Sequence, residues 1–195
     1  MKNAAVLFTD VRNLGFPTET FDIALCGFMG WYDCFDFVTN EFTQPDTKAP
    51  EIRRVLRDGG RLVCCSWEAQ EDLAWMEESM LHQYPAILQD EEYLHQRPIG
   101  MAYEKAVGYE MVFRAAGFRD IEISRETAEF VSTDEEEWWR QMSSVGWQTS
   151  FEKIELDGAD QLKRIKEAMF RDLQPYKQPD GIHFTKSVFF VSGVK

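Results

Sequence analysis

The sequence predicts an α/β protein built on a mostly parallel β-sheet, in a single domain that covers residues 1–195. Residues 21–26 and 61–67 are short apolar segments, as expected of strands that are buried on both faces. Residues 49–60 lie between them, with apolar side chains at helical spacing and two glycines at the end, which predicts a helix and a turn. A strand, a crossover helix and a second strand form the unit from which parallel sheets are built.

The remaining patterns extend this alternation of strands and helices along the chain. Residues 4–9 form a short apolar run that is typical of a buried strand, and residues 10–17 are expected to form a loop. Residues 31–47 give no clear pattern. Further on, we expect helices over residues 70–89, 103–116 and 159–173, a strand over 118–123 that continues through 131, and a final strand over 187–194.

The start of one more helix is indicated by an acidic run in which Thr133 and Glu136 have the spacing of a capping box. Acidic side chains are favoured near the positive N-terminal end of a helix, so the run is explained without a metal. Three tryptophans, Trp138, Trp139 and Trp147, lie on or just after this helix. They are either packing anchors or the wall of an apolar substrate pocket.

The composition is typical of a soluble globular protein, with 44% hydrophobic and 28% charged residues. No apolar run approaches the roughly 18 residues of a membrane span, and the N-terminus lacks the basic and apolar pattern of a signal peptide. We therefore expect a cytoplasmic protein without a membrane partner. The net charge of −13 argues against nucleic acid as a partner, because phosphate binding depends on clustered lysine and arginine.

The four cysteines, Cys26, Cys34, Cys64 and Cys65, show no C-x-x-C spacing. Three of them fall in or beside predicted strands, where a reduced cysteine behaves as a small apolar residue. The three histidines stand far apart in the sequence. We expect neither a metal site nor a disulfide framework.

Several segments resemble, in order and spacing, the small-molecule methyltransferases that use S-adenosylmethionine (class I, methyltransferase domain 11 or ubiquinone-biosynthesis-like). Residues 10–17 resemble the family's loop of an acidic residue followed by Leu-Pro-Phe-Pro, and residues 21–26 resemble its fourth strand. Residues 53–63 are similar to its Arg-Val-Leu-x-x-Gly-Gly turn and fifth strand, and residues 115–118 to the turn before its sixth strand. Residues 180–194 resemble its seventh strand, so the resemblance covers nearly the whole chain.

The resemblance implies S-adenosylmethionine as the cofactor and a small molecule as the methyl acceptor. In the family, the loop aspartate accepts a hydrogen bond from the adenine amino group and the next residue's backbone meets the adenine ring. These roles fall on Asp10 and Val11, whereas Cys26, Gly27 and Phe28 would face the methionine part of the cofactor. No catalytic residue is expected, because the acceptor itself attacks the methyl group. The candidates for the wall of the acceptor pocket are Tyr32, Trp138, Trp139 and Trp147.

The chain departs from the family at its beginning. It contains no glycine-rich loop of the G-x-G-x-x-G kind, and it starts at the family's third strand. We therefore expect an incomplete Rossmann-like methyltransferase sheet of strands 3 to 7 with an antiparallel last strand, N-terminally truncated relative to the family. In the family's strand order, 3-2-1-4-5-7-6, residues 21–26 would then form an open apolar edge. We expect a homo-oligomer that associates through this edge, or movement of residues 4–9 to cover it.

Two other interpretations stay open at this level. A catalytically inactive methyltransferase-like protein would keep the fold for assembly or partner binding, because half of the family's cofactor site is absent. The chain could also be a fragment of a longer protein. Binding of S-adenosylmethionine separates the methyltransferase from the inactive protein.

Overall fold

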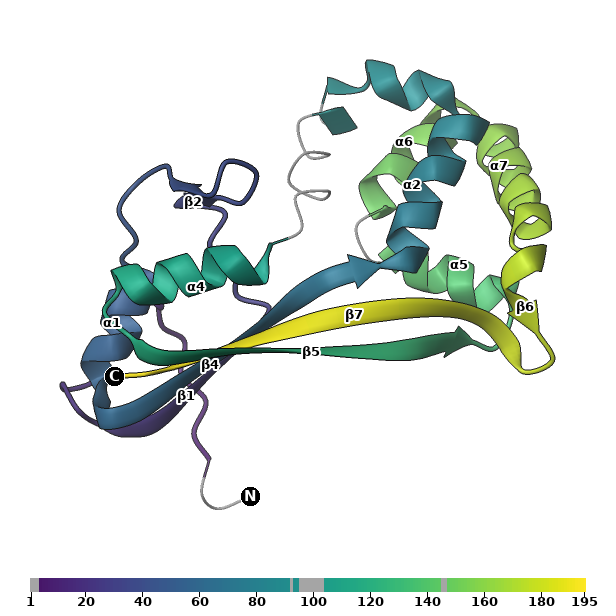
Figure 1. The fold of residues 1–195 in the computed structure, drawn as a ribbon. Helices are drawn as coiled ribbons and strands as arrows, with labels where there is room; N and C mark the ends of the chain where they lie inside the picture. Colours follow the sequence, from purple (N-terminus) through teal and green to yellow (C-terminus); the bar gives the residue numbers. More distant parts are fainter. Residues whose placement is uncertain (1–3, 92, 95–103, 145–146) are drawn as a thin grey trace. The chain divides into compact units, whose positions relative to one another are not determined.

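The computed structural model describes residues 4–91, 93–94, 104–144 and 147–195. The chain divides into two compact units, whose elements are drawn in Figure 1. Unit 1 comprises Met1–Glu68, Ala102–Glu126 and Val188–Lys195, and unit 2 comprises Ala69–Met101 and Thr127–Ser187. Each unit has its own hydrophobic core. The single methyltransferase-like domain expected over residues 1–195 stays a prediction.

The predicted strand–helix–strand unit is present in unit 1. The strand β1 (Phe21–Gly27) is followed, further along the chain, by the helix α1 (Lys48–Val55) and by the strand β4 (Leu56–Gln70). β1 and β4 pair in parallel, with Cys26 beside Cys64. The two strands and the crossover helix between them are therefore confirmed. The expected burial of residues 21–26 is wrong, because none of these residues is fully buried in β1.

A tight turn leads from α1 into the paired part of β4. Gly59 has a φ of 79°, a conformation that residues with a side chain rarely adopt. A Cβ atom on Gly60 would lie 2.8 Å from the carbonyl oxygen of Arg57 and 3.1 Å from that of Asp22. The two glycines that predicted the turn are thus required by the backbone geometry where β4 meets β1.

The main sheet has the strand order β1-β4-β7-β5. β5 spans Arg119–Ser132, within one residue of the strand expected over 118–131, whereas β7 spans Gly181–Val194 and begins six residues before the expected strand. Figure 1 shows the arrow of β7 pointing opposite to those of β4 and β5, so the last strand is antiparallel to its neighbours in unit 1. The α/β class and the order of the family's fourth, fifth, seventh and sixth strands are thereby confirmed.

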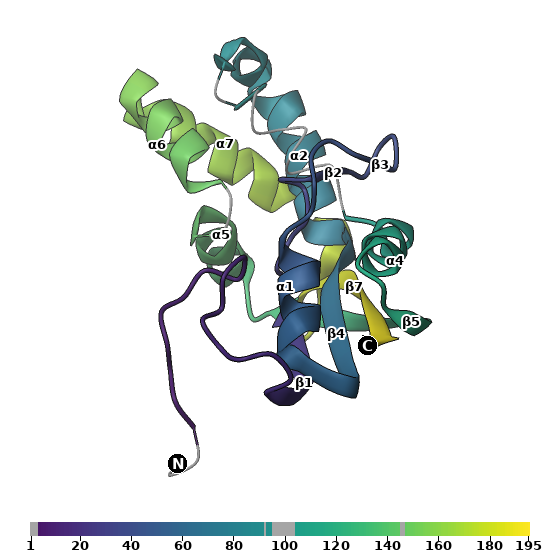
Figure 2. The same cartoon turned by 90° about the vertical axis from the view of Figure 1, so that its left-hand side faces the viewer.

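One face of this sheet is covered in unit 1 by α1 and by the helix α4 (Ala106–Ala115), both visible in Figure 2. The core between helices and sheet includes Ile52, Leu62, Tyr109, Phe113 and Phe189. Because successive side chains of a strand point to opposite faces, Ala24 and Cys26 pack against this core. Ile23 and Leu25 point away from it and are exposed.

Residues 31–47, which show no clear pattern in the sequence, contain a small antiparallel hairpin. It is formed by β2 (Phe35–Asp36) and β3 (Glu41–Phe42). The rings of Phe35 and Phe42 meet edge to face, with their centroids 5.0 Å apart. Two-residue strands are too short for an alternating pattern, so aromatic packing rather than periodicity holds this segment.

The predicted strand at residues 4–9 is wrong. The structure gives this segment no regular secondary structure, and Val6 and Phe8 are fully exposed. A single strand is not stable in water without a neighbour that pairs with its backbone. The apolar composition of the segment suggested a strand, but composition says nothing about whether such a neighbour is present.

Unit 2 is mainly helical. Its α-helices are α2 (Glu71–Gln83), α5 (Glu135–Ser144), α6 (Gln148–Asp157) and α7 (Ala159–Asp172). Two 3₁₀ helices accompany them, η1 (Pro85–Gln89) and η2 (Gln174–Tyr176). The short strand β6 (Lys177–Gln178) pairs with β7. The core is rich in methionine and aromatic side chains, including Met76, Met80, Trp138, Met169 and Phe184.

One helix prediction in unit 2 needs correction, and one helix of this unit is missing from the predictions. The helix expected over residues 70–89 ends at Gln83, because Pro85 has no backbone N–H to continue the α-helical hydrogen bonds. α6 was not predicted at all. α7 agrees with the expected helix to within one residue.

The capping box of α5 lies one residue later than the sequence indicates. The Asp134 carboxylate accepts a hydrogen bond of 2.7 Å from the backbone N–H of Glu137. The Glu137 carboxylate accepts a hydrogen bond of 2.6 Å from the backbone N–H of Thr133. Glu136, expected to complete the box, instead pairs with Lys166 at 2.6 Å.

We expect Asp134→Ala to lower the free energy of unfolding by about 1 kcal/mol, because the first turn of α5 loses its side-chain cap. Glu136→Ala should change it by less than about 0.5 kcal/mol, because an exposed ion pair contributes little. Urea denaturation measures both values. Equal effects, or a larger effect at Glu136, would contradict this assignment of the cap.

His183 is a nearly buried side chain of β7 with a carboxylate on each side of its ring. Its Nε2 lies 2.8 Å from Asp180, and its Nδ1 lies 3.0 Å from Glu129 on β5. The Asp180 hydrogen bond, followed by that of Glu129, raises the pKa of His183 above its ordinary value. The same contact lowers the pKa of Asp180. The His183 ring therefore links β5, β7 and the turn before β7 within unit 2, and its protonated form is favoured by both carboxylates.

This arrangement predicts a pH dependence of stability. The raised pKa of folded His183 stabilises the protein fully below the unfolded histidine pKa of about 6.5. The contribution is lost as the pH rises from there through the pKa of the folded state. His183→Gln should flatten the dependence of the urea midpoint on pH in this window, whereas His82→Gln, at an exposed histidine of α2, should leave it unchanged.

Candidate functional site

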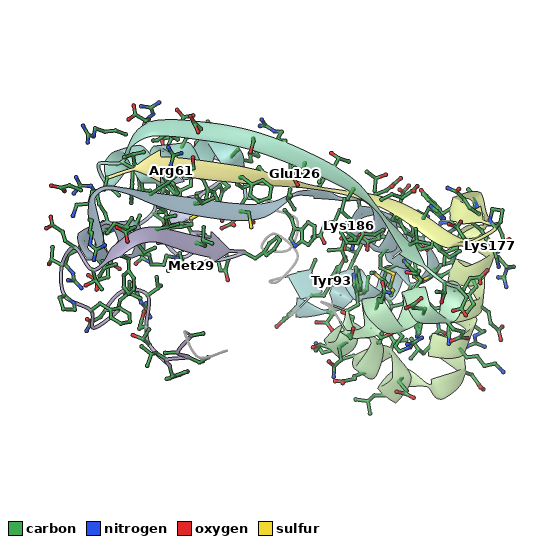
Figure 3. All side chains as sticks on the ribbon, turned by 90° about the horizontal axis from the view of Figure 1, so that it is seen from below. Met29, Arg61, Tyr93, Glu126, Lys177 and Lys186 are labelled. Carbon is green, nitrogen blue, oxygen red and sulfur yellow. The ribbon has the colours of Figure 1, made fainter. Side chains whose placement is uncertain are left out.

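A pocket of about 410 Å³ lies in unit 1 at the carboxyl end of β1, where ligands of parallel sheets gather. Met29, labelled in Figure 3, follows this end of the strand closely. The volume is within the range of sites for small molecules. We call it the β1 pocket, and its lining residues are Asp10, Val11, Arg12, Phe28, Met29, Gly30, Tyr32, Asp33 and Lys48.

Asp10 and Arg12 form an ion pair with two side-chain hydrogen bonds at the wall of the β1 pocket. Arg12 donates from Nε to Oδ1 of Asp10 at 3.0 Å and from a terminal nitrogen to Oδ2 at 2.8 Å. The backbone N–H of Arg12 also donates to Oδ1, at 2.9 Å. The pKa of Asp10 is lowered by these hydrogen bonds, and the largest contribution comes from the Arg12 side chain. The carboxylate is therefore ionised and held in a fixed orientation, although it is half-exposed.

Phe28 has an uncommon backbone conformation for a bulky residue, with a φ of 54°. Its backbone N–H donates to the carbonyl oxygen of Cys65 on β4 at 2.9 Å. The ring is half-exposed and lies 4.9 Å from the ring of Trp67. A strained residue directly after a strand, at the wall of a pocket, is a frequent feature of functional sites.

Lys48, the first residue of α1, is the buried cation of the β1 pocket. Its side chain is only 8% exposed, and its Nζ donates to the carbonyl oxygen of Gly30 and to the carboxylate of Asp33, both at 2.5 Å. The same nitrogen lies 5.4 Å from the centre of the Trp31 ring. Asp33 is 44% exposed, so the pair is buried on the lysine side only. These contacts fix the segment 30–33 against α1.

Glu104 holds the other side of the same segment. One carboxylate oxygen accepts a hydrogen bond of 2.7 Å from the backbone N–H of Trp31. The other accepts one of 2.9 Å from the hydroxyl of Ser66 on β4, and a second from the hydroxyl of Tyr109 on α4. Burial, followed by the charge of Glu104, raises the pKa of Tyr109, which stays a neutral donor.

Four of the sequence-predicted site residues line the β1 pocket together: Asp10, Val11, Phe28 and Tyr32. Cys26 and Gly27 do not line it. The Cys26 thiol faces the core, where Cys64 hydrogen-bonds to it and lowers its pKa. Gly27 lies beside Cys65 of β4. The assignment of cofactor contacts to all five residues stays a prediction.

The three tryptophans expected at the acceptor pocket belong to unit 2. Trp138 is buried in its core, and Trp147 is nearly so. Trp139 is partly buried and stacks on Phe151, with the ring centres 4.5 Å apart. All three therefore take part in packing, and their role in acceptor binding stays a prediction.

Sequence reasoning missed five of the residues that line the β1 pocket. Arg12 and Gly30 follow predicted site residues by only two positions, so sequence proximity could have found them. Met29 also directly follows one. Asp33 directly follows Tyr32, so the same signal applies to it, whereas Lys48 carries none, because its partners Gly30 and Asp33 lie 18 and 15 positions away.

Two features are absent from the part of the chain that the structure describes, residues 4–91, 93–94, 104–144 and 147–195. In these ranges, no group of three His, Cys, Asp or Glu side chains is placed to hold a metal ion. Among the helices of the same part of the chain, none is long and apolar enough to cross a membrane.

No family model matches the chain, and no curated protein matches it. Solved structures of similar fold exist. A protein of Anaeromyxobacter dehalogenans assigned as a type II methyltransferase has a TM-score of 0.52 at 18% identity, over 95% of this chain and 69% of its own. A protein of Bacillus halodurans assigned as a methyltransferase has a TM-score of 0.45 at 16% identity, over 96% and 69%.

A third structure is phosphoethanolamine N-methyltransferase 2 of Haemonchus contortus in complex with S-adenosyl-L-methionine. Its TM-score is 0.37 at 15% identity, over 95% of this chain and 36% of that enzyme. The likeness to the first of the three structures confirms the methyltransferase-like α/β fold expected from the sequence. Fold alone does not determine the reaction, which must be argued from the site.

The contacts of Lys48 predict an asymmetry between the two ends of its ion pair. Asp33→Asn leaves a buried ammonium without a countercharge and should lower the free energy of unfolding by about 1–3 kcal/mol. Lys48→Met removes the buried charge and leaves a carboxylate that reaches water, so it should cost less. Asp22→Asn, in the exposed pair with Arg57, is the matched control and should cost less than about 0.5 kcal/mol. Urea denaturation tests this order, and a larger loss for Lys48→Met would contradict it.

Proposed function

We propose that the chain is an S-adenosylmethionine-dependent methyltransferase that acts on a small-molecule acceptor. One observation carries the proposal. The β1 pocket is lined by Asp10, Val11 and Phe28. The sequence resemblance implies that Asp10 and Val11 contact the adenine of the cofactor and that Phe28 faces its methionine part. Tyr32, a candidate for the acceptor wall, lines the same pocket.

The chemistry of these residues fits the cofactor. An ionised carboxylate such as Asp10 accepts hydrogen bonds from an amino group, and the neighbouring backbone offers polar groups to an adenine ring. Arg12 already donates to both oxygens of Asp10, so an adenine amino group would share this carboxylate with the guanidinium. The exposed rings of Phe28 and Tyr32 offer faces that attract a positively charged sulfonium.

When bound, the cofactor supplies a methyl group on a positively charged sulfur. The residues of the pocket then have three tasks: to bind, to align the acceptor with the methyl group, and to exclude water. The acceptor contributes the attacking lone pair, so the proposal assigns no catalytic residue. The segment 30–33, fixed by Lys48 on one side and Glu104 on the other, supports the alignment.

A small molecule is the proposed acceptor, because the net charge of −13 disfavours nucleic acid. The cytoplasm is the proposed location. Self-association through the edge of β1 is a proposal as well, and so is a single methyltransferase-like domain over residues 1–195.

Isothermal titration of the full chain with S-adenosylmethionine tests the proposed function. We expect saturable binding with a dissociation constant in the micromolar range. Absence of binding would overturn the proposal and favour the alternative, a catalytically inactive protein that uses the fold for assembly or partner binding.

Asp10→Ala should weaken this binding by about 1–3 kcal/mol, because the adenine loses its charged hydrogen-bond acceptor. The matched control is Asp22→Ala, at an aspartate that also pairs with an arginine in unit 1 but does not line the pocket. It should leave the affinity unchanged. If titration shows the same affinity for both variants and for the unaltered chain, the adenine does not contact Asp10.

A further inference from the structure

The outer edge of β1 is unpaired. In the strand order of the main sheet β1 is the last strand, and the described residues place no strand on its outer side. Such an edge presents backbone N–H and C=O groups that can pair with a further strand. Its side chains add an apolar surface, because Ile23 is 61% exposed and Leu25 is 76% exposed.

The segment 4–9 has the complementary property. Its sequence, Ala-Ala-Val-Leu-Phe-Thr, is apolar and suited to a strand, yet it forms none in the structure. Val6 and Phe8 are 99% and 109% exposed. Figure 2 shows the chain before Asp10 leading away from β1 toward the N-terminus. Unit 1 therefore carries both an edge without a strand and a strand-like segment without a sheet.

The connection between the two features opposes pairing within one copy. Asp10 and Phe28 line the same pocket, so the segment ends beside the carboxyl end of β1 and could pair with it only in parallel. Parallel neighbours need a crossover of about a dozen residues or more. Residues 10–20, which would have to form this crossover, are fewer than that. They are also held on α1 by two hydrogen bonds. The Glu51 carboxylate accepts one from the backbone N–H of Leu14 at 2.9 Å, and Arg54 donates the other to the carbonyl oxygen of Phe16 at 2.8 Å.

We propose that two copies of this chain exchange the segments 4–9, each of which pairs with the edge of β1 in the other copy. The exchange is reciprocal, so the assembly closes as a symmetric dimer. The two features carry five large apolar side chains: Val6, Leu7, Phe8, Ile23 and Leu25. Complete coverage of these, at about 100 Å² for each aliphatic one and about 200 Å² for Phe8, sets an upper limit of about 1,200 Å² for the two contacts together. This limit lies at the lower end of stable interfaces, which begin at about 1,200 Å².

Net charge opposes the association, since each copy carries −13. The apolar contacts must outweigh this repulsion, and salt screens it. We therefore expect the dimer to become tighter as salt is raised from about 0.05 M to about 0.5 M. An interface that depended on ion pairs would respond in the opposite direction.

Light scattering coupled to size exclusion tests the proposal on the full chain over a dilution series. The expected mass is twice the 22.8 kDa of one chain. Hydrogen exchange should show protected backbone amides in residues 5–8 under the same conditions. A monomer at every concentration, or a ladder of larger species instead of a closed dimer, would overturn the exchange.

Single lysines locate the contact. Phe8→Lys and Leu25→Lys should each convert the dimer to a monomer, because a charged side chain replaces an apolar contact between the segment and the edge, and charged side chains oppose strand pairing at edges. Val38→Lys is the control, since Val38 is also apolar and exposed, at 72%, but belongs to the β2–β3 turn. It should leave the dimer intact. Far-UV circular dichroism confirms that each variant is folded.

Deletion of residues 4–9 separates this exchange from direct pairing of two β1 edges. The proposed dimer requires the segment, so the deleted chain should be a monomer. A dimer that persists after the deletion would contradict the exchange.

Discussion

The carboxylate of Glu104 is the interaction on which the β1 pocket depends. It accepts hydrogen bonds from three segments of unit 1: the backbone after β1 at Trp31, the hydroxyl of Ser66 on β4, and the hydroxyl of Tyr109 on α4. The carboxylate is partly buried, and these donors replace water that it has lost. They hold the backbone after β1, and Lys48 holds the same segment through Gly30 and Asp33. The pocket is thus shaped by polar contacts beneath its lining.

The fold of unit 1 follows from local patterns to a large extent. The short apolar segments of β1 and β4 and the stripe on α1 are visible in the sequence, as is the turn at Gly59 and Gly60. Pairing is not local, and this explains the failure at residues 4–9. That segment has the composition of a strand, but strand formation also requires a neighbour, which composition does not specify. In unit 2, the helical spacing of apolar residues continues past Pro85, so the sequence predicts a helix that runs through it. The proline itself is a local signal for the end of that helix.

The residues of the candidate site also divide into those that local motifs predict and those that depend on contacts distant in the sequence. Asp10, Val11, Phe28 and Tyr32 were found because two short motifs carry them, and they meet in one pocket. Lys48 and Glu104 were not found, because their contacts join residues 18 and 73 positions apart. No spacing rule connects such positions in a single sequence. The capping box of α5 shows the smaller error that remains even for a local motif, a shift of one residue to Asp134 and Glu137.

The tryptophans are unevenly distributed between the two cores. Trp31 and Trp67 belong to unit 1, whereas Trp75, Trp138, Trp139 and Trp147 belong to unit 2. Intrinsic fluorescence therefore reports mainly on the helical unit, whereas the far-ultraviolet circular dichroism signal has contributions from the helices and strands of both units. A chain that unfolds in one cooperative step gives coincident transitions by both probes. A separation between the two curves would show that the two units do not unfold together, without any label added to the protein.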